Sequence, residues 1–314
     1  MRYAECASRA TGAWSRFWFA PGSAANLGFC RMGYVAALLY LLGLRGFGVW
    51  AAAPEALWEP VLPFRWLGLG PLSAGALEAL GAVLRIALLS AAFGALTRTS
   101  CAVAAVLFFY LAGLQQCFGI IYHSTTTVPL VLLTLAVARS GDCWSLDSLL
   151  RRLRNRAGAT CGISTAEYTW PIQLIRTLSM LVFFAAGVAK LRHSGLDWAS
   201  SDSLRTILLA EYYEPPPPAS DLGLWIAAHP YVCSVGAIGM LSAEMLAPLA
   251  LVSKRARRVL IPVLFAFVAS LPLLFGFPFY GLMAIFVFWI RWDGLWPLPR
   301  KRAEGVASAR EAPA

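Results

Sequence analysis

Charged residues are scarce in this chain, and lysine is almost absent. Only 13% of the 314 residues are charged, and the 26 basic residues include just three lysines, Lys190, Lys254 and Lys301. An ordinary soluble domain has about 25% charged residues, so the low charge content of this chain excludes that class of protein. The hydrophobic share of 59% and the mean hydropathy of +0.66 instead predict a polytopic membrane protein.

Common catalytic and binding motifs are also missing. The sequence has no G-x-G-x-x-G, P-loop or G-x-S-x-G, so nucleotide binding and serine-hydrolase chemistry have no support. The net charge of +10 lies in short loops beside apolar runs, where membrane orientation and anionic lipid explain it better than nucleic acid.

The cysteines form no C-x-x-C pair and no spacing typical of a metal site, so we expect no metal. They are Cys6, Cys30, Cys101, Cys117, Cys143, Cys161 and Cys233. We interpret them as small apolar residues, with a disulfide between any two of them as the less favoured alternative.

Eight apolar runs are predicted to be membrane-spanning helices, because an apolar helix of about 20 residues crosses a bilayer. The predicted spans are 27–44, 77–96, 101–121, 124–138, 172–190, 223–252, 259–275 and 278–292. They predict one all-α transmembrane domain (27–292) between an N-terminal segment (1–26) and a basic tail (293–314). The abundance of arginine over lysine suits a bacterium, and we expect a multi-pass protein of the bacterial inner membrane.

Basic loop residues predict the orientation of these spans. The loop 139–171 carries five arginines and the loop near Lys254 reads KRARR, so both are expected in the cytoplasm. With eight crossings, both termini are then cytoplasmic (N-in, C-in), and the acidic segment 191–222 lies outside.

The fourth span has an apolar part, VPLVLLTLAVA, of only 11 residues, which cannot cross a bilayer alone. The preceding YHSTTT (122–127) is therefore predicted to join the helix, which places His123 at or below the outer membrane surface. The alternative is that these polar side chains only bond to neighbouring helices. After this span, leucines alternate with arginines in 144–156, which predicts an amphipathic helix on the inner surface.

Lys190 ends the fifth span and is the only lysine before residue 254. A lysine in a dry site can lose its proton and act as a base, whereas arginine cannot. The alternative is a lysine that merely reaches for water at a helix end. Gly187 and Ala186, three and four residues earlier, favour close helix packing, so we expect Lys190 to face protein on the same side as His123.

Other polar side chains near these two residues are candidates for substrate binding. They are Tyr122, Ser124, Thr125, Gln116 and Trp198. For Gln116, hydrogen bonding between helices is the alternative. Arg85 and Glu244 lie inside apolar runs, where an unpaired charge is costly, and both are expected to be paired.

Five segments in this order resemble the HTTM family, the membrane domain shared with vitamin K-dependent gamma-carboxylase, over nearly the whole chain. They are LGFCRMG (27–33), GALTRTSCAVAAVLFFYL (94–111), YHSTTT (122–127), GDCWSLD (141–147) and FFAAGVAKLRHSGLDW (183–198). The resemblance implies that Lys190 deprotonates a reduced quinone and that His123 holds or protonates an oxygen. Ala189 stands where the carboxylase has a second lysine.

The implied cofactor is reduced vitamin K or menaquinone, and the implied product is a quinone epoxide. The carboxylase also acts on a peptide or protein substrate, which it holds with a large extracytoplasmic portion. This chain ends soon after its last predicted span, so glutamate carboxylation is left open. Whether the chain is an enzyme is also open, since a non-catalytic membrane factor that assists maturation or export of a peptide is the alternative.

Overall fold

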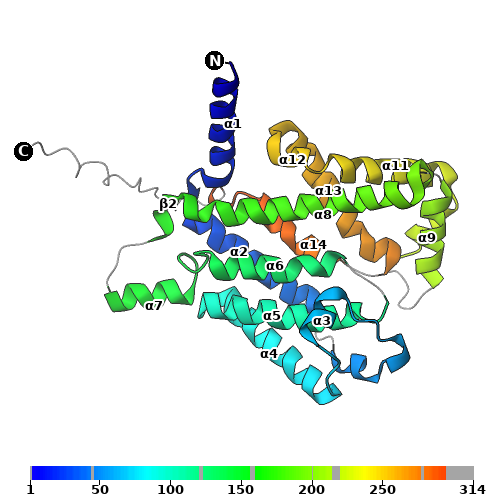
Figure 1. Cartoon of the computed structure of the whole chain (residues 1–314), viewed down its shortest axis with the longest axis horizontal. Coiled ribbons are helices and arrows are strands. Elements are labelled where there is room, and N and C mark those ends of the chain that lie inside the picture. Colours follow the sequence, from blue (N-terminus) through cyan, green and yellow to red (C-terminus); the bar gives the residue numbers. More distant parts are fainter. Residues whose placement is uncertain are drawn as a thin grey trace, which may run out of the picture. The chain divides into compact units, whose positions relative to one another are not determined.

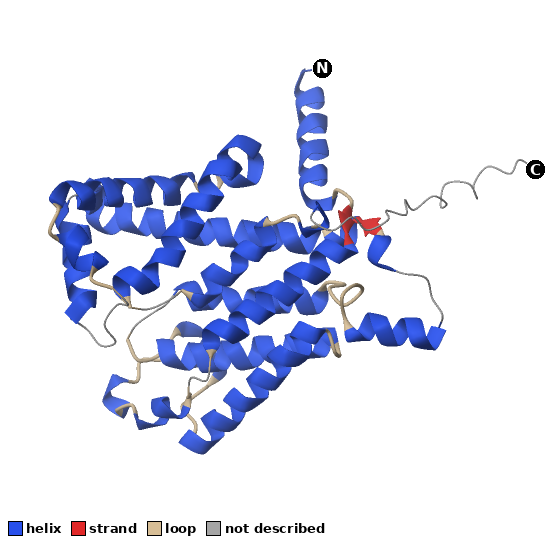
Figure 2. Ribbon diagram, turned by 180° about the vertical axis from the view of Figure 1, so that it is seen from behind, coloured by secondary structure: helices blue, strands red, loops and turns tan. Residues whose placement is uncertain are grey.

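The structure is a computed structural model that describes residues 2–43, 46–119, 123–155, 160–199, 201–213, 220–276 and 279–294. Helices make up most of this part of the chain (Figure 1, Figure 2). Their contacts divide the chain into two compact units. The first consists of Met1–Ile121, Val128–Ile175 and Ile290–Ala314, and the second of Tyr122–Thr127 and Arg176–Trp289.

The first unit is built around α4 (Ala74–Phe93), which packs against α2 (Ala24–Leu42) and α5 (Thr97–Gln116). Its other helices are α1 (Arg2–Phe19), η1 (Gly48–Ala52), η2 (Glu55–Leu57), α3 (Leu62–Leu67), most of α6 (His123–Val137), α7 (Leu146–Asn155), η3 (Thr160–Gly162), η4 (Ala166–Tyr168) and η7 (Trp292–Gly294). A two-residue strand, β1 (Gly22–Ser23), pairs antiparallel with β2 (Ser164–Thr165).

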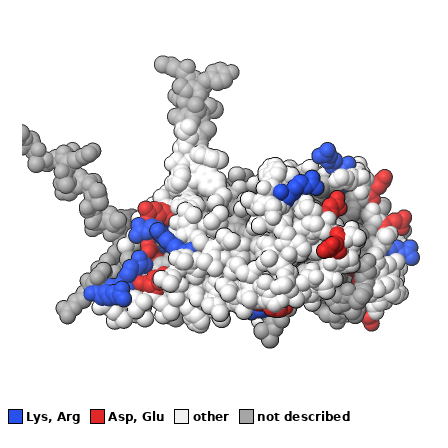
Figure 3. All heavy atoms as spheres, turned by 60° about the horizontal axis from the view of Figure 1, so that its bottom comes forward, with Lys and Arg blue, Asp and Glu red and all other residues white. Residues whose placement is uncertain are grey.

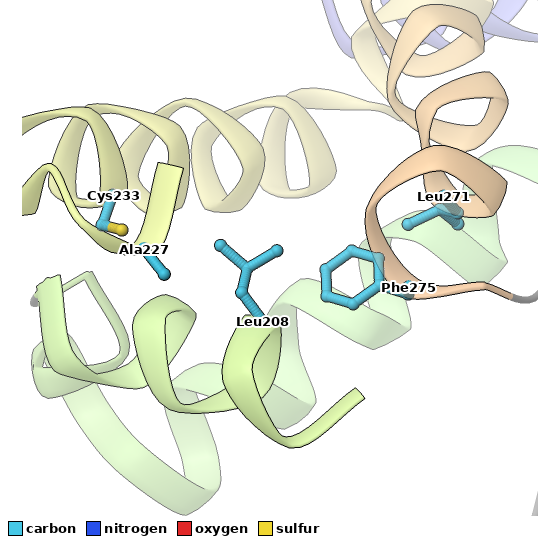
Figure 4. Packing of buried hydrophobic residues seen from close by; sticks show 5 residues of the cluster. All are labelled: Leu208, Ala227, Cys233, Leu271 and Phe275. Atoms are coloured by element: carbon cyan, nitrogen blue, oxygen red, sulfur yellow. The ribbon is translucent and has the colours of Figure 1, made fainter. Parts of the chain in front are cut away.

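The second unit contains the larger part of α8 (Trp170–Ser194), which begins in the first unit. It continues with η5 (Gly195–Ala199), α9 (Ser201–Tyr213), α10 (Leu222–Ala227), α11 (Pro230–Leu246), α12 (Leu249–Val252), α13 (Lys254–Phe275), α14 (Tyr280–Ile285) and η6 (Phe286–Trp289). Buried apolar side chains from α9, α10, α11 and α13 meet in one cluster, shown in Figure 4: Leu208, Ala227, Cys233, Leu271 and Phe275.

Five helices of the described part are long and apolar enough to cross a membrane. They are α2, α4, α5, the continuous stretch Ala166–Ala199 that contains α8, and α13. Shorter apolar helices are Thr125–Val137 within α6, and α11. Charged side chains gather in a few patches and leave wide areas of the visible surface without charge (Figure 3). The fold is therefore all-helical and multi-pass, whereas eight crossings and their orientation stay predictions.

The structure corrects the predicted spans in detail. The run 223–252, predicted as one helix, is divided into α10, α11 and α12, because Pro230 starts α11 and Pro248 precedes α12. The last predicted span contains only the six residues of α14 and a 3-10 turn. Helix α6, which corresponds to the fourth predicted span, begins at His123, so the polar residues from His123 to Thr127 join it, whereas Tyr122 lies outside the described residues.

The interpretation of all cysteines as unpaired is wrong for two of them. Cys143 and Cys161 form a disulfide across the connection that contains α7. The pairing was not visible in the sequence because the two residues are 18 positions apart and meet only through the intervening fold. Cys30, Cys101, Cys117 and Cys233 are buried and lie outside any disulfide of the described residues, as predicted.

Three of the segments that carry the family resemblance meet inside the first unit. The fully buried Arg31 of LGFCRMG donates hydrogen bonds to the carbonyls of Ser140 (2.8 Å) and Trp144. Gly28 lies so close to Cys143 that a Cβ on it would come within 2.5 Å of the Cys143 carbonyl oxygen. Asp147 in turn binds the first residues of α5. These segments therefore hold the first unit together.

Candidate functional site

Lys190 lies near the end of α8 and pairs with Glu244 of α11. The Lys190 Nζ atom is 2.5 Å from Glu244 Oε1, and the two side chains are 18% and 3% exposed. This contact confirms that Lys190 faces protein and that Glu244 is paired. It also identifies the partner of each, which the sequence left open.

A glycine one turn before Lys190 allows α8 and α11 to approach. A Cβ at Gly187 would lie 3.0 Å from Met245 Sδ and 3.1 Å from Glu244 Cβ, so a larger side chain would separate the helices. Residues three apart share a helix face, and Gly187 and Lys190 therefore both face α11. The small residue sets the distance at which the lysine meets the carboxylate.

Trp198 completes the surroundings of the lysine. The chain turns after α8 at Gly195, which has a positive φ of 60°, and continues into η5. This turn brings the Trp198 ring to 5.1 Å from Lys190 Nζ, a distance at which a cation is attracted by the ring face.

A cavity of about 200 Å³ lies in the second unit beside this pair. Its polar lining consists of Lys190, Glu244, Trp198 and Glu211. Its apolar lining consists of Val182, Phe183, Ala186, Leu204, Ile207, Met240, Phe267, Leu271, Phe275, Phe279 and Leu282. Figure 4 shows Leu271 and Phe275 of this lining on α13. An ionisable pair in a mostly apolar cavity is the arrangement expected of an acid-base site.

Two buried polar atoms at this cavity make no hydrogen bond within the described part of the chain. They are Glu244 Oε2, an acceptor, and Trp198 Nε1, a donor. Buried polar groups normally have partners, because leaving one unsatisfied costs about 1–3 kcal/mol. A ligand with both a donor and an acceptor would satisfy them.

The structure brings together only some of the predicted site residues. Lys190 and Trp198 are in contact, and Gln116 is buried at the end of α5 in the first unit. Thr125 lies in the second unit and is half-buried. Tyr122 and the side chains of His123 and Ser124 lie outside the described residues. The pairing of Lys190 with His123 therefore stays a prediction.

Sequence reasoning missed the role of Glu244 and the presence of Glu211 at the cavity. A signal for the first existed, because Lys190 and Glu244 are each a lone charge at or in an apolar run. Two such charges in the membrane are expected to find each other. Arg85, the other charge of this kind, has partners that include the Gly43 carbonyl (3.5 Å) and the Phe47 ring.

Apolar helices of spanning length and a buried lysine-carboxylate pair beside a mostly apolar cavity define a multi-pass membrane protein with a candidate acid-base site. The model of the HTTM domain matches residues 19–292, and the chain therefore belongs to the HTTM family. This membership confirms the resemblance and relates the chain to the carboxylase that shares the domain. No curated protein and no solved structure matches it.

Proposed function

We propose that this protein is an enzyme that takes a proton from a reduced lipid quinone, with Lys190 as the base, and converts the quinone to its epoxide. The observation that carries the proposal is the buried contact between Lys190 and Glu244 at an apolar cavity. We place the site at the outer side of a bacterial inner membrane, in the N-in and C-in orientation that the loop charges predict.

The cavity suits the ring of such a quinone. Pockets for drug-sized ligands measure roughly 300–1,000 Å³, and about 200 Å³ is room for a ring but not for a long tail. The tail of a lipid quinone would stay among apolar side chains or lipid. One ring hydroxyl would donate to Glu244 Oε2, and a ring oxygen would accept from Trp198 Nε1, two atoms of the cavity-lining residues that make no hydrogen bond within the described part.

The lysine must be neutral before it can accept a proton. The hydrogen bond from Lys190 Nζ to Glu244 Oε1 gives its proton a route to the carboxylate, after which the free amine can deprotonate the hydroquinone. Overall, one hydroquinone and one O₂ give one quinone epoxide and one water, so no further oxidant is needed. We assign His123 the role of holding an oxygen of the reacting ring.

The test is to incubate the purified full chain, reconstituted in lipid, with reduced menaquinone and oxygen, and to measure the epoxide by mass spectrometry. We expect epoxide from the unmodified protein and from Lys254→Ala, since Lys254 is exposed at the start of α13. The Lys190→Arg protein, which keeps a positive charge beside Glu244 but cannot act as a base, should lose at least about 100-fold in rate, the lower range for a general base.

Epoxide formed equally by both lysine variants would contradict the role of Lys190. Absence of epoxide from the unmodified protein as well would contradict the reaction itself. That second outcome would favour a non-catalytic membrane factor for a peptide.

A further inference from the structure

A second cavity, of about 810 Å³, lies in the first unit and is rich in arginine. It is formed by the start of α5, the connection from α6 to α7, and α7 itself. Its lining residues are Leu96, Thr97, Arg98, Thr99, Ala138, Arg139, Gly141, Asp142, Asp147, Leu150, Arg151 and Arg154. The reaction proposed above does not use any of them.

One of the two carboxylates in this lining is fully engaged by the protein. Asp147 accepts hydrogen bonds from the backbone amides of Leu96 (2.8 Å) and Thr97 (2.7 Å), and from the Thr97 hydroxyl (2.7 Å). Burial opposes ionisation of Asp147, but these hydrogen bonds outweigh it and hold its pKa below the usual value. Asp147 therefore stays charged and occupies the N-terminus of α5, which leaves no anion site there.

The other carboxylate holds two of the four arginines. Asp142 pairs with Arg139 (2.8 Å) and Arg151 (3.1 Å), and it also accepts a hydrogen bond from the Tyr168 hydroxyl (3.0 Å). Arg139 makes a second ion pair with Glu167 (2.7 Å). These two arginines are thus held in place by acidic side chains.

Arg98 and Arg154 differ from Arg139 and Arg151 in their lack of an acidic partner among the described residues. Both are exposed, and neither forms an ion pair with a described residue. Four arginines against two aspartates leave the cavity lining with an excess of two positive charges. Basic and acidic side chains also lie next to one another in the charged patches of Figure 3.

Helix α7, which lines this cavity, indicates a position at the edge of the membrane. Its leucines Leu146, Leu149, Leu150 and Leu153 are 44%, 50%, 51% and 71% exposed although they are apolar. A helix with exposed leucines and many arginines lies in the plane of the membrane, at the depth of the lipid head groups. The arginines that line the cavity are therefore expected at the depth of the lipid phosphates.

We propose that this cavity binds the phosphate head group of an anionic phospholipid, with Arg98 and Arg154 as its direct ligands. The guanidinium group binds phosphate oxygens with two parallel hydrogen bonds, which favours arginine over lysine for this purpose. Thr99 at the same cavity offers a hydroxyl to the head group. Free phosphate shares this chemistry, but the leucines of α7 favour a phosphate that is attached to a lipid.

The experiment measures lipid binding to the purified full chain in detergent by native mass spectrometry, with phosphatidylglycerol and phosphatidylcholine as probes. The Arg98→Gln/Arg154→Gln protein is compared with Arg255→Gln/Arg258→Gln, which removes two exposed arginines from the start of α13 instead. We expect the affinity for phosphatidylglycerol to fall about 30-fold in the first variant only, since each arginine contributes about fivefold near an anionic surface.

Equal affinities in the two double variants would overturn the proposal, and so would equal binding of phosphatidylcholine and phosphatidylglycerol. Competition by inorganic phosphate at the same concentration as the lipid would show that the site is for a small anion and would also overturn it. Should the first variant fail to fold, Arg154→Gln alone is expected to lose about fivefold. The Arg98→Lys/Arg154→Lys protein keeps the charge but not the paired hydrogen bonds, so it should bind phosphatidylglycerol more weakly than the unmodified protein and more tightly than Arg98→Gln/Arg154→Gln.

Discussion

Lys190 and Glu244 are two ionisable side chains that their apolar surroundings tolerate only together. Removing one member of a buried ion pair typically costs about 3–5 kcal/mol, because the other charge stays behind without compensation. Glu244→Ala is therefore a poor probe of chemistry, since it changes both folding and the lysine. A substitution that keeps the shape of the side chain and an acceptor for Lys190 disturbs the fold less.

Glu244→Gln keeps the hydrogen bond to Lys190 but cannot take up its proton. If the carboxylate accepts the lysine proton, kcat for the epoxide should fall about 100-fold, and the KM for the quinone should rise as well, because the amide lacks the second oxygen that accepts from the ring hydroxyl. Glu211→Gln, the same chemical change in the lining of the same cavity, serves as the control and should keep most of the activity. Equal losses of kcat in the two variants would exclude a special role for the carboxylate that contacts Lys190.

The sequence predicted which way Lys190 faces but not what it meets. The direction could be inferred because Gly187 and Ala186 are local, one turn away on the same helix. The partner could not, because Glu244 is 54 residues further along the chain and no spacing rule connects separate helices. The same limit applies to the cavity lining, which comes from α8, α9, α11, α13 and their neighbours.

The packing of α8 against α11 brings Lys190 and Glu244 together at the cavity. Gly187→Ala should push these helices apart by a few tenths of an ångström, because the new Cβ would lie 3.0 Å from Met245 Sδ. Overpacking of this kind costs about 1–3 kcal/mol, and it should lower both the melting temperature and the rate of epoxide formation. Thermal unfolding in detergent and the epoxide assay measure the two effects.

The matched control is Gly239→Ala on α11, where a Cβ would meet nothing within 4 Å. Alanine is a better helix former than glycine, so this variant should keep its activity and gain up to about 1 kcal/mol. A Gly187→Ala protein as stable and active as Gly239→Ala would show that the close approach of the two helices is unimportant.

Hydropathy predicted where helices lie better than where they break. The runs at α2, α4, α5 and α13 were found because an apolar stretch of spanning length has one simple explanation. The mean hydropathy of a long stretch changes little with one proline. The helix breaks at Pro230 and Pro248 were therefore not predicted, and the run appeared as one long span. Helix α9 was missed because it lies in a polar connection, where its burial against α11 stabilises it more than its own sequence does.

Seen across the whole molecule, the family segments serve two purposes. LGFCRMG, the start of α5 and GDCWSLD bind one another in the first unit through Arg31, which donates to the Trp144 carbonyl, and through Asp147. The segment from Phe183 to Trp198 supplies the lysine and the tryptophan of the cavity in the second unit. Family resemblance in this chain thus reflects both packing and candidate chemistry, and residues cannot be assigned to a reaction from the motifs alone.

The disulfide and the loop charges point to opposite sides of the membrane. Five arginines in 139–171 predict a cytoplasmic connection, whereas disulfides persist mainly in oxidising compartments. Cys143 and Cys161 both lie in this connection. With the N-in orientation, we expect the two thiols to be reduced in living cells and to form the disulfide after isolation in air.

Cells expressing the full chain should be quenched in acid, which stops thiol exchange, and then alkylated before and after reduction with two reagents of different mass. Mass spectrometry of the peptides with Cys143 and Cys161 should find both residues carrying the first reagent. A secreted protein with a known disulfide, treated in parallel, should carry only the second reagent and so show that quenching does not reduce disulfides. If Cys143 and Cys161 also carry only the second reagent, the connection faces an oxidising compartment, and the orientation of every span must be reversed, because adjacent spans alternate in direction.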